Sequence, residues 1–211
     1  MNFSGTIRGV VKTRKWNTRR RGEHQGCRRL SILLLATWGC AVTAGNISAQ
    51  ANSTGEYAVK AAFLFHFAQF VEWPPAAFKD ANSPMTYCTL GVDPFRGSLD
   101  ESFRGKTIGE RVIRVQHLRP GEGIQDCQIL FIGAGENKRA AGILANVKGN
   151  AILTVGESQD FAEDGGMIGF CLEGNKIRFN INLAAASAAK LKMSARLLTL
   201  AKTVIGTPGG S

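Results

Sequence analysis

The stretch of sequence that decides the fold is Gly166–Leu183, which reads GMIGFCLEGNKIRFNINL. Apolar and polar residues alternate on either side of Gly174-Asn175, a dipeptide that suits a two-residue primed turn with positive φ. The pattern therefore predicts a β-hairpin whose strands run over Met167–Leu172 and Lys176–Ile181.

The register of this hairpin follows from its turn. With the turn at the centre, one face holds three apolar cross-strand pairs, which are Ile168 with Ile181, Phe170 with Phe179, and Leu172 with Ile177. The other face holds Glu173 with Lys176, Cys171 with Arg178, Gly169 with Asn180, and Met167 with Asn182. No other register separates apolar from polar side chains so cleanly, so this is the register that we predict.

The rest of the chain alternates strands with helices. Strands are expected over Tyr87–Val92, Arg111–Leu118, Cys127–Ile132 and Ala151–Val155, and a polar loop over Gly156–Gly165. Helices are expected over Tyr57–Trp73, Gly97–Phe103, Asn137–Val147, Leu183–Ala189 after the cap Asn182, and Ala195–Val204 after the cap Ser194. This order predicts an α/β fold: a single three-layer domain with a mixed β-sheet flanked by helices, parallel in its first strands, with a C-terminal β-hairpin and helices.

The helix over Tyr57–Trp73, which Pro74-Pro75 closes, is apolar nearly all round. Its polar residues do not gather on one stripe, so we expect cover on more than one side. Two sources of cover are open: the domain's own sheet, which would make this a core helix, or a second subunit. The residues of such an interface would be Tyr57, Phe63, Phe67, Phe70 and Trp73.

The positive charge is concentrated at the N-terminus. Nine of the 26 Lys and Arg residues lie within residues 1–50, together with one of the 16 Asp and Glu residues. The formal net charge of +10 therefore belongs mostly to this segment. The rest of the chain is near neutral, and we expect no nucleic-acid partner for it.

The same segment is typical of a secretory signal peptide. Basic residues precede Leu30–Val42, an apolar run too short to span a bilayer, and Ala49-Gln50-Ala51 follows as a cleavage site. We expect residues 1–51 to be removed, with cleavage after Ala49 as the alternative. Residues 52–205 then form the domain, and residues 206–211 a disordered tail.

The predicted export determines how the cysteines are expected to pair. Cys88, Cys127 and Cys171 remain after the leader is lost, and pairing is expected in oxidising surroundings. Cys88 and Cys127 lie at or near the starts of apolar strands, so they can meet if those strands are parallel neighbours. Cys171 sits opposite Arg178, whose charge favours a thiolate. An inert thiol, an intermolecular disulfide and thiol exchange all remain open for Cys171.

The sequence contains no recognisable catalytic set. It lacks the G-x-S-x-G, H-E-x-x-H and C-x-x-C patterns, and His66 and His117 stand apart, with His66 expected to be a satisfied core histidine. Gly133-x-Gly135 after an apolar strand resembles the start of a dinucleotide-binding unit with Glu157 further on, but Lys138 replaces the third glycine. We expect no enzyme activity, cofactor or metal. A small anionic ligand at that helix N-terminus is the alternative.

Several stretches together resemble the YfiR family. They are Glu56–Leu64 (EYAVKAAFL), Phe67, Phe70–Pro74, Asp93-Pro94-Phe95, Cys127–Ile132, Leu153–Ser158, Gly165–Ile168, Asn175–Phe179 and Ile181–Ala186. The resemblance extends over Glu56–Val204, which is essentially the whole predicted mature chain.

The resemblance implies a periplasmic regulator without catalytic activity. A YfiR-type protein holds an inner-membrane diguanylate cyclase of the YfiN type inactive, and an outer-membrane lipoprotein of the YfiB type relieves that repression. It also implies a homodimer and a disulfide between Cys88 and Cys127. Some relatives have a second disulfide, but the residue opposite Cys171 here is Arg178, which argues against that second bridge in this chain.

Two classes of function therefore stand. The first is a repressor that controls cyclic-di-GMP output, and with it biofilm formation, by binding a membrane client. The second is a periplasmic small-ligand-binding protein, an accessory sensor for a histidine kinase, or an unrecognised enzyme. This second class would use a pocket near Gly133–Asn137 or Glu157.

Overall fold

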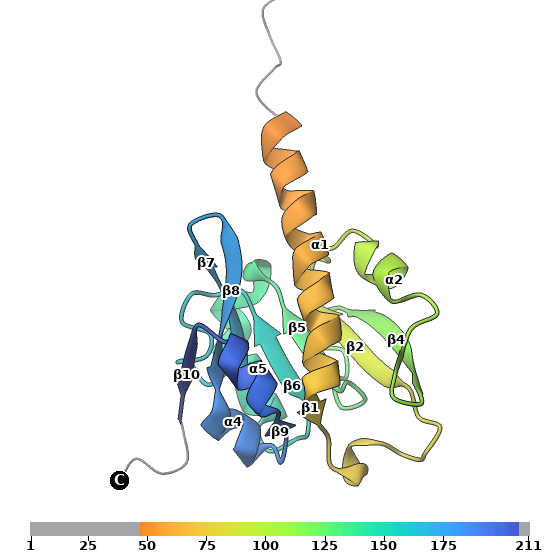
Figure 1. Ribbon diagram of the computed structural model, residues 1–211. Helices are drawn as coiled ribbons and strands as arrows, with labels where there is room; N and C mark the ends of the chain where they lie inside the picture. Colours follow the sequence, from red (N-terminus) through yellow and green to blue (C-terminus); the bar gives the residue numbers. More distant parts are fainter. Residues whose placement is uncertain (1–46, 207–211) are drawn as a thin grey trace, which may run out of the picture. The chain divides into compact units, whose positions relative to one another are not determined.

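The computed structural model describes residues 47–206, which form an α/β domain with helices on both faces of a mixed sheet (Figure 1). The predicted fold class is confirmed. The predicted signal peptide lies outside the described residues except for its last residues, 47–51, and the predicted tail lies outside them except for Gly206.

The central sheet has eight strands in the order β10-β8-β7-β6-β5-β2-β4-β3. Their bounds are β2 Met85–Leu90, β3 Thr107–Ile108, β4 Arg111–Leu118, β5 Ile129–Ile132, β6 Leu153–Gly156, β7 Ile168–Glu173, β8 Lys176–Asn182 and β10 Thr203–Ile205. The run from β4 through β2, β5 and β6 to β7 is parallel, as predicted. The pairs β7–β8 and β3–β4 are antiparallel, and β10 runs parallel to β8.

The helices precede, connect and follow these strands. Their bounds are α1 Ile47–Phe70, α2 Ser98–Phe103, α3 Ala140–Val147, α4 Leu183–Ala188 and α5 Ala195–Leu200. Two 3₁₀ helices, η1 Pro75–Ala77 and η2 Ala134–Arg139, lie after α1 and before α3. The predicted helix over Asn137–Val147 is thus a 3₁₀ turn followed by a shorter α-helix.

The hairpin β7–β8 has the predicted register along its whole length. Ile168 pairs with Ile181, Phe170 with Phe179, Cys171 with Arg178, and Glu173 with Lys176. Gly174 has a φ of 59°, which the primed turn requires and which glycine adopts without strain. The alternating pattern and the turn chemistry agree, and together they fix the pairing.

Apolar side chains pack against both faces of the sheet. On one face α1 and α2 cover the larger cluster, which includes Tyr87, Phe131, Val155 and Phe170. On the other face α3 and the loop after β6 cover a smaller cluster, which includes Leu130, Ile132, Val147 and Phe161. Buried strands with apolar residues on both faces explain the near-continuous apolar runs in the sequence.

The loop after β6 is less polar than predicted, because Phe161 is fully buried at its centre. Its ring lies directly against Gly156 and Gly166, where a Cβ on either glycine would overlap the ring atoms. The absence of a side chain at both glycines therefore lets the loop fold back over the sheet.

Helix α1 differs from its prediction at both ends. It begins at Ile47, inside the predicted signal peptide and before the expected polar spacer Asn52–Glu56. It ends at Phe70, because Val71–Glu72 form a short strand, β1, that pairs antiparallel with β9, Lys192–Met193. The backbone N–H of Ser194 also donates to the carbonyl of Phe70 at 2.9 Å. Strand pairing and the restriction that Pro74 places on Trp73 together end the helix early.

The C-terminal helix is also shorter than predicted. Ser194 caps α5 as expected, since its hydroxyl accepts from the N–H of Leu197. Ala201 is extended, however, and the chain continues as β10 beside β8. The hydrogen bonds offered by the open edge of β8 outweigh a further helical turn. Asn182 caps α4 as predicted, by accepting from the N–H of Ala185.

Three parallel strands begin at positions other than those predicted. β2 starts at Met85 and ends before Gly91, whose φ is 88°, so Cys88 lies in mid-strand. β5 and β6 begin at Ile129 and Leu153, whereas the predicted strands begin at Cys127 and Ala151. Backbone hydrogen bonds from Gln128 to Thr86 and from Leu153 to Gln128 still extend the ladder there, so this difference lies at frayed strand ends.

Candidate functional site

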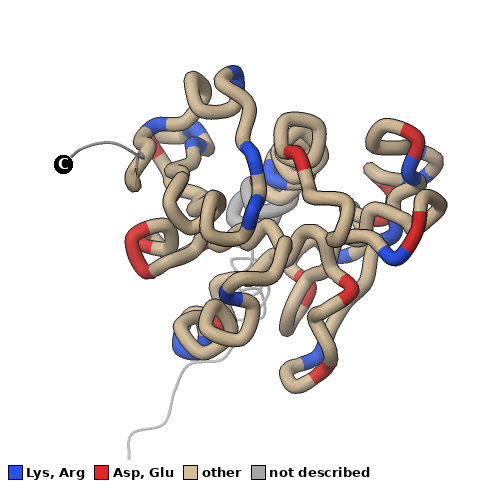
Figure 2. The backbone as a smooth tube through the Cα atoms, turned by 90° about the horizontal axis from the view of Figure 1, so that it is seen from below, with Lys and Arg blue, Asp and Glu red and all other residues tan. Residues whose placement is uncertain are grey.

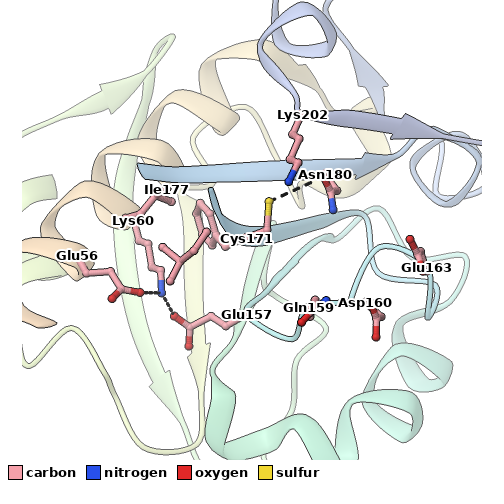
Figure 3. A pocket seen from close by; sticks show the side chains of 12 residues that line it. Glu56, Lys60, Glu157, Gln159, Asp160, Glu163, Cys171, Ile177, Asn180 and Lys202 are labelled. Carbon is pink, nitrogen blue, oxygen red and sulfur yellow. Dashed lines mark hydrogen bonds and ion pairs between the residues drawn. The ribbon is translucent and has the colours of Figure 1, made fainter. Parts of the chain in front are cut away.

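A cleft of about 510 Å³ with a mainly polar lining lies beside the hairpin β7–β8 (Figure 3). It is bounded by α1, by the loop that follows β6, and by the hairpin itself. The lining residues are Glu56, Lys60, Glu157, Gln159, Asp160, Glu163, Phe170, Cys171, Leu172, Ile177, Asn180 and Lys202. It brings together two residues singled out from the sequence, Glu157 and Cys171.

A buried ion pair closes one end of the cleft. Lys60, 5% exposed, contacts the carboxylates of both Glu157 and Glu56 (Figure 3). The ammonium group also lies 4.5 Å from the ring centroid of Tyr57. A buried ammonium group needs such partners, since an unpaired charge inside a protein costs several kcal/mol. Lys60 therefore ties α1 to the end of β6.

The Glu157 carboxylate also reaches the Gly133-x-Gly135 turn. It accepts the backbone N–H of Ala134 at 3.0 Å and the hydroxyl of Tyr57 at 3.4 Å. The amide expected to meet an anionic ligand is thus already satisfied by an anion of the chain itself. A 3₁₀ helix follows instead of an α-helix, so the resemblance to a dinucleotide-binding unit ends at the turn.

The environment of Tyr57 perturbs its ionisation. Burial is the largest cause, followed by the charge of Glu157, the hydrogen bond to Glu157 and the charge of Glu56. Together they raise the pKa of Tyr57 to about 12. A neutral phenol is favoured here because a phenolate would lie among carboxylates.

Cys171 is the one unpaired cysteine among the described residues, and it is half-buried. Its side chain turns into the cleft, where the sulfur lies 3.9 Å from the Asn180 amide oxygen (Figure 3). Arg178 stands opposite it in the register, as predicted, but the Arg178 Nε atom lies 3.8 Å from the Glu173 carboxylate.

The structure joins Cys88 and Cys127 in a disulfide, with their Cα atoms 5.9 Å apart. The bond links the middle of β2 to the residues that lead into β5, its parallel neighbour. Both residues are buried in the smaller apolar cluster. A bond in this place crosslinks the sheet and is shielded from solution thiols.

The proposed interface residues of α1 divide into two groups. Phe67 is 1% exposed and packs edge-on against Phe179, so the chain's own core covers it. Tyr57, Phe63, Phe70 and Trp73 are half-buried against the same core. Within residues 55–70 of α1, the exposed positions are Gly55, Ala58, Val59, Ala62, His66 and Gln69. The sheet thus supplies most of the cover that the helix needs.

Sequence reasoning missed a cluster around His117. Its Nδ1 lies 2.8 Å from the Thr89 hydroxyl, its Nε2 lies 3.0 Å from the Asp100 carboxylate, and Asp93 lies nearby at 3.9 Å. The pairing of β2 with β4 places Thr89 beside His117, a contact that no sequence spacing indicates. Thr89 is buried, so its hydroxyl is not an accessible nucleophile.

The prediction for His66 is wrong. It is exposed on α1 and lies 2.9 Å from the Gln69 side chain, so it is not a core histidine. No cluster of three or more His, Cys, Asp or Glu side chains suited to a metal occurs within residues 47–206. In the same residues no helix is both long and apolar enough to cross a bilayer.

Charge is mixed over the domain. Lys and Arg residues lie among Asp and Glu residues along the described chain (Figure 2). The two signs of charge are thus interspersed along its backbone.

Comparison with known families gives one match. A family model described as YfiR/HmsC-like matches residues 57–202 of the 211. The match extends from Tyr57 in α1 to the residue before β10, and so includes the disulfide, the hairpin and every lining residue of the cleft except Glu56. A comparison with curated proteins found no match.

Proposed function

Because the chain belongs to the YfiR/HmsC-like family, we propose that it is a periplasmic, non-catalytic regulator that binds the periplasmic domain of a membrane signalling protein. The match over residues 57–202 is the observation that carries the proposal. The proposed client is an inner-membrane diguanylate cyclase of the YfiN type, which the chain represses and whose cyclic-di-GMP output it thereby lowers. A histidine kinase is the alternative client.

Two features of the molecule support the proposed location. The N-terminal segment has the composition of a signal peptide, and a disulfide joins β2 to the residues that lead into β5. Disulfides of this kind persist in oxidising compartments such as the periplasm. We propose further that the regulator acts as a homodimer, and that an outer-membrane lipoprotein of the YfiB type relieves repression.

Gene deletion tests the proposal directly. Loss of a repressor should raise cellular cyclic-di-GMP and surface attachment. Complementation with the complete gene should restore both, whereas a version without residues 1–51 should restore neither, since it stays in the cytoplasm. If deletion leaves cyclic-di-GMP unchanged but alters the output of a neighbouring histidine kinase, the client is the kinase and not the cyclase.

A small-ligand-binding function is the second candidate, and the cleft favours it. Four carboxylates and two amino groups line the cleft. Lys60 pairs with Glu56 and Glu157, and Lys202 lies 3.6 Å from the Glu173 carboxylate, so the remaining charges of the lining are those of Asp160 and Glu163. Such a lining suits a small cation. If spermidine raises the melting temperature of the wild type but not that of Asp160→Asn/Glu163→Gln, the ligand-binding function is supported. Equal shifts in both proteins would exclude this cleft.

A further inference from the structure

A second pocket, of about 360 Å³, lies toward the amino ends of the parallel strands. Its floor consists of Thr86 on β2, Arg114 and Gln116 on β4, and Gln128, which leads into β5. The 3₁₀ helix η1 and the loop after it form one wall, and the residues before β5 form the other. This pocket shares no lining residue with the cleft beside the hairpin.

The strand register places the floor residues on one face of the sheet. β2 and β4 are parallel, and Thr86 lies beside Arg114 in this pairing. Two residues further on, Cys88 lies beside Gln116. Side chains two residues apart on a strand share a face, and Cys88 belongs to the smaller apolar cluster. The floor is therefore a polar extension of the face that this cluster occupies.

Gln128 holds the floor and one wall together. Its side chain is buried, its Oε1 accepts the backbone N–H of Thr86 at 2.8 Å, and its Nε2 donates to the carbonyl of Ala77 at 2.9 Å. The contact with Ala77 uses one of the two N–H groups of the amide, so a second donor remains. A buried amide that is held at both ends is preorganised, which lowers the entropy cost of binding.

The Thr86 side chain is buried, but the fold makes no use of its hydroxyl. Thr86 is 4% exposed. Within residues 47–206 its hydroxyl forms no hydrogen bond, yet it is not one of the sealed polar atoms there, so it opens onto the pocket. A hydroxyl in such a position costs stability unless a water molecule or a ligand bonds to it. The pocket thus offers a donor and an acceptor that folding does not require.

Arg114 supplies the free charge of the pocket. The other two charged residues of the lining, Lys79 and Asp126, pair with each other at 2.9 Å. Arg114 forms no ion pair with the residues that the structure describes, so one positive charge of the lining is uncompensated. In the cleft beside the hairpin, by contrast, Lys60 already contacts two carboxylates. A guanidinium group presents a planar fork of donors that matches a carboxylate.

The wall beside this charge is anchored to the sheet. Arg111 lies on the opposite face of β4 from Arg114, and its guanidinium group is 3.7 Å from the centroid of the Phe78 ring. It also donates to the carbonyl of Ser83 at 2.6 Å. Phe78 and Ser83 both line the pocket. Contacts within the chain therefore build this wall, and no ligand is needed to order it.

We propose that this pocket binds a small organic carboxylate that also has hydroxyl or amide groups. Arg114 pairs with the carboxylate, while the Thr86 hydroxyl and the amides of Gln116 and Gln128 bond to the neighbouring polar groups. The volume of about 360 Å³ is near the lower end of the range for ligand sites, about 300–1,000 Å³, and suits one sugar acid or the end of a peptide. The proposal does not depend on a membrane client.

Isothermal titration calorimetry with glucuronate and with acetyl-glycyl-glycine tests the proposal. At least one of these acids should bind, and the tighter of the two identifies the source, a sugar acid or a peptide C-terminus. Glucose and acetyl-glycyl-glycine amide lack the carboxylate and should bind at least about tenfold more weakly. If neither acid binds at millimolar concentration, or if the uncharged analogues bind equally well, the proposal is wrong.

Replacement of Arg114 tests the location of the site. Arg114→Gln should raise the dissociation constant of the bound acid about tenfold or more, because the charge that pairs with the carboxylate is lost. Arg119→Gln is the matched control, since Arg119 is exposed directly after β4 and does not line the pocket. Its affinity should equal that of the wild type. Equal affinities of the two variants would exclude this pocket.

Thr86→Val separates binding from folding. Valine has the shape of threonine and removes only a hydroxyl that the described chain leaves without a partner, so the melting temperature should stay the same or rise. The dissociation constant of the bound acid should nevertheless increase about fivefold, through the loss of one hydrogen bond. A purely structural role for Thr86 would give the opposite result, a lower melting temperature with unchanged affinity, and would overturn the proposed contact.

Discussion

The base and the tip of the β7–β8 hairpin have the same alternating sequence but differ in burial. At the base, Ile168, Phe170, Phe179 and Ile181 are all buried. At the tip, Cys171–Arg178, Leu172 is exposed and Ile177 is half-buried on the same face. Alternation determines which way a side chain points, whereas the length of the neighbouring elements determines whether it is covered.

The neighbours of the hairpin account for this difference. Phe63 and Phe67 of α1 pack against Phe170 and Phe179. β6 pairs with β7 only to Gly169, and β10 pairs with β8 only from Asn180. The tip extends past both strands. Identical substitutions in the buried body of the domain and at the tip should therefore have very different effects.

The largest difference is expected between two cysteine substitutions. Cys88→Ser removes the disulfide, which closes a sequence separation of 39, and should lower the free energy of unfolding by about 4 kcal/mol. Cys171→Ser at the tip should change it by less than about 0.5 kcal/mol. Urea denaturation followed by tryptophan fluorescence measures both values. Non-reducing peptide mapping should find Cys88 linked to Cys127; a link to Cys171 would contradict this prediction.

Apolar truncations should give the next largest difference. Ile181→Ala at the base leaves a cavity in a fully buried site and should cost about 3 kcal/mol. Leu172→Ala, on the same face of the hairpin, should cost about 0.5 kcal/mol or less because the side chain is already exposed. The comparison belongs in the monomeric concentration range. Similar losses for both variants would mean that the tip is covered in solution.

A buried and an exposed ion pair should likewise differ in how much they stabilise the domain. Glu157→Gln leaves Lys60 with only the partly exposed Glu56, and should cost about 2 kcal/mol, less than the full loss of a buried pair. Asp126→Asn breaks the exposed pair with Lys79 and should cost no more than about 0.5 kcal/mol. Thermal unfolding of the two variants measures the difference. A larger loss for Asp126→Asn would show that burial does not set these energies.

The smallest effect concerns Tyr57 and appears only at high pH. Its pKa is raised to about 12 in the folded chain, compared with about 10 when unfolded. The folded state therefore retains a proton that the unfolded state has lost, and stability should fall as pH rises from 10 to 12. Tyr57→Phe should reduce this loss. In the native protein, the phenolate absorbance at 295 nm should show no tyrosine that titrates near pH 10. A tyrosine titrating near pH 10 would contradict the prediction.

Much of the fold could be predicted from the sequence where a period or a turn specified it. The hairpin register follows from Gly174-Asn175 and from alternation over both strands, and β4 has its predicted bounds, Arg111–Leu118. The strands β1, β3, β9 and β10 were missed. Each has only two or three residues, too few for a period to be recognised, and pairing with a distant segment stabilises it.

The candidate site was predictable only in part. Glu157 was singled out as part of a possible dinucleotide-binding unit, whereas it pairs with Lys60, a contact that was not predicted. Cys171 lies opposite Arg178 as predicted, and it also contacts Asn180. Lys60 and Glu157 lie far apart in sequence and meet only because α1 crosses the end of β6. The same holds for His117, whose partners come from β2, α2 and the loop between them. Such contacts depend on tertiary packing, which no local pattern encodes.

The packing of Phe161 has a consequence for how this family can vary. Its ring lies in the space that a Cβ at Gly156 or Gly166 would need. The residues at these three positions can therefore change only together. A larger residue at either glycine should be found only where position 161 has lost its aromatic ring. In a library randomised at all three positions and selected for folded protein, this mutual exclusion should emerge as strong covariation of position 161 with positions 156 and 166.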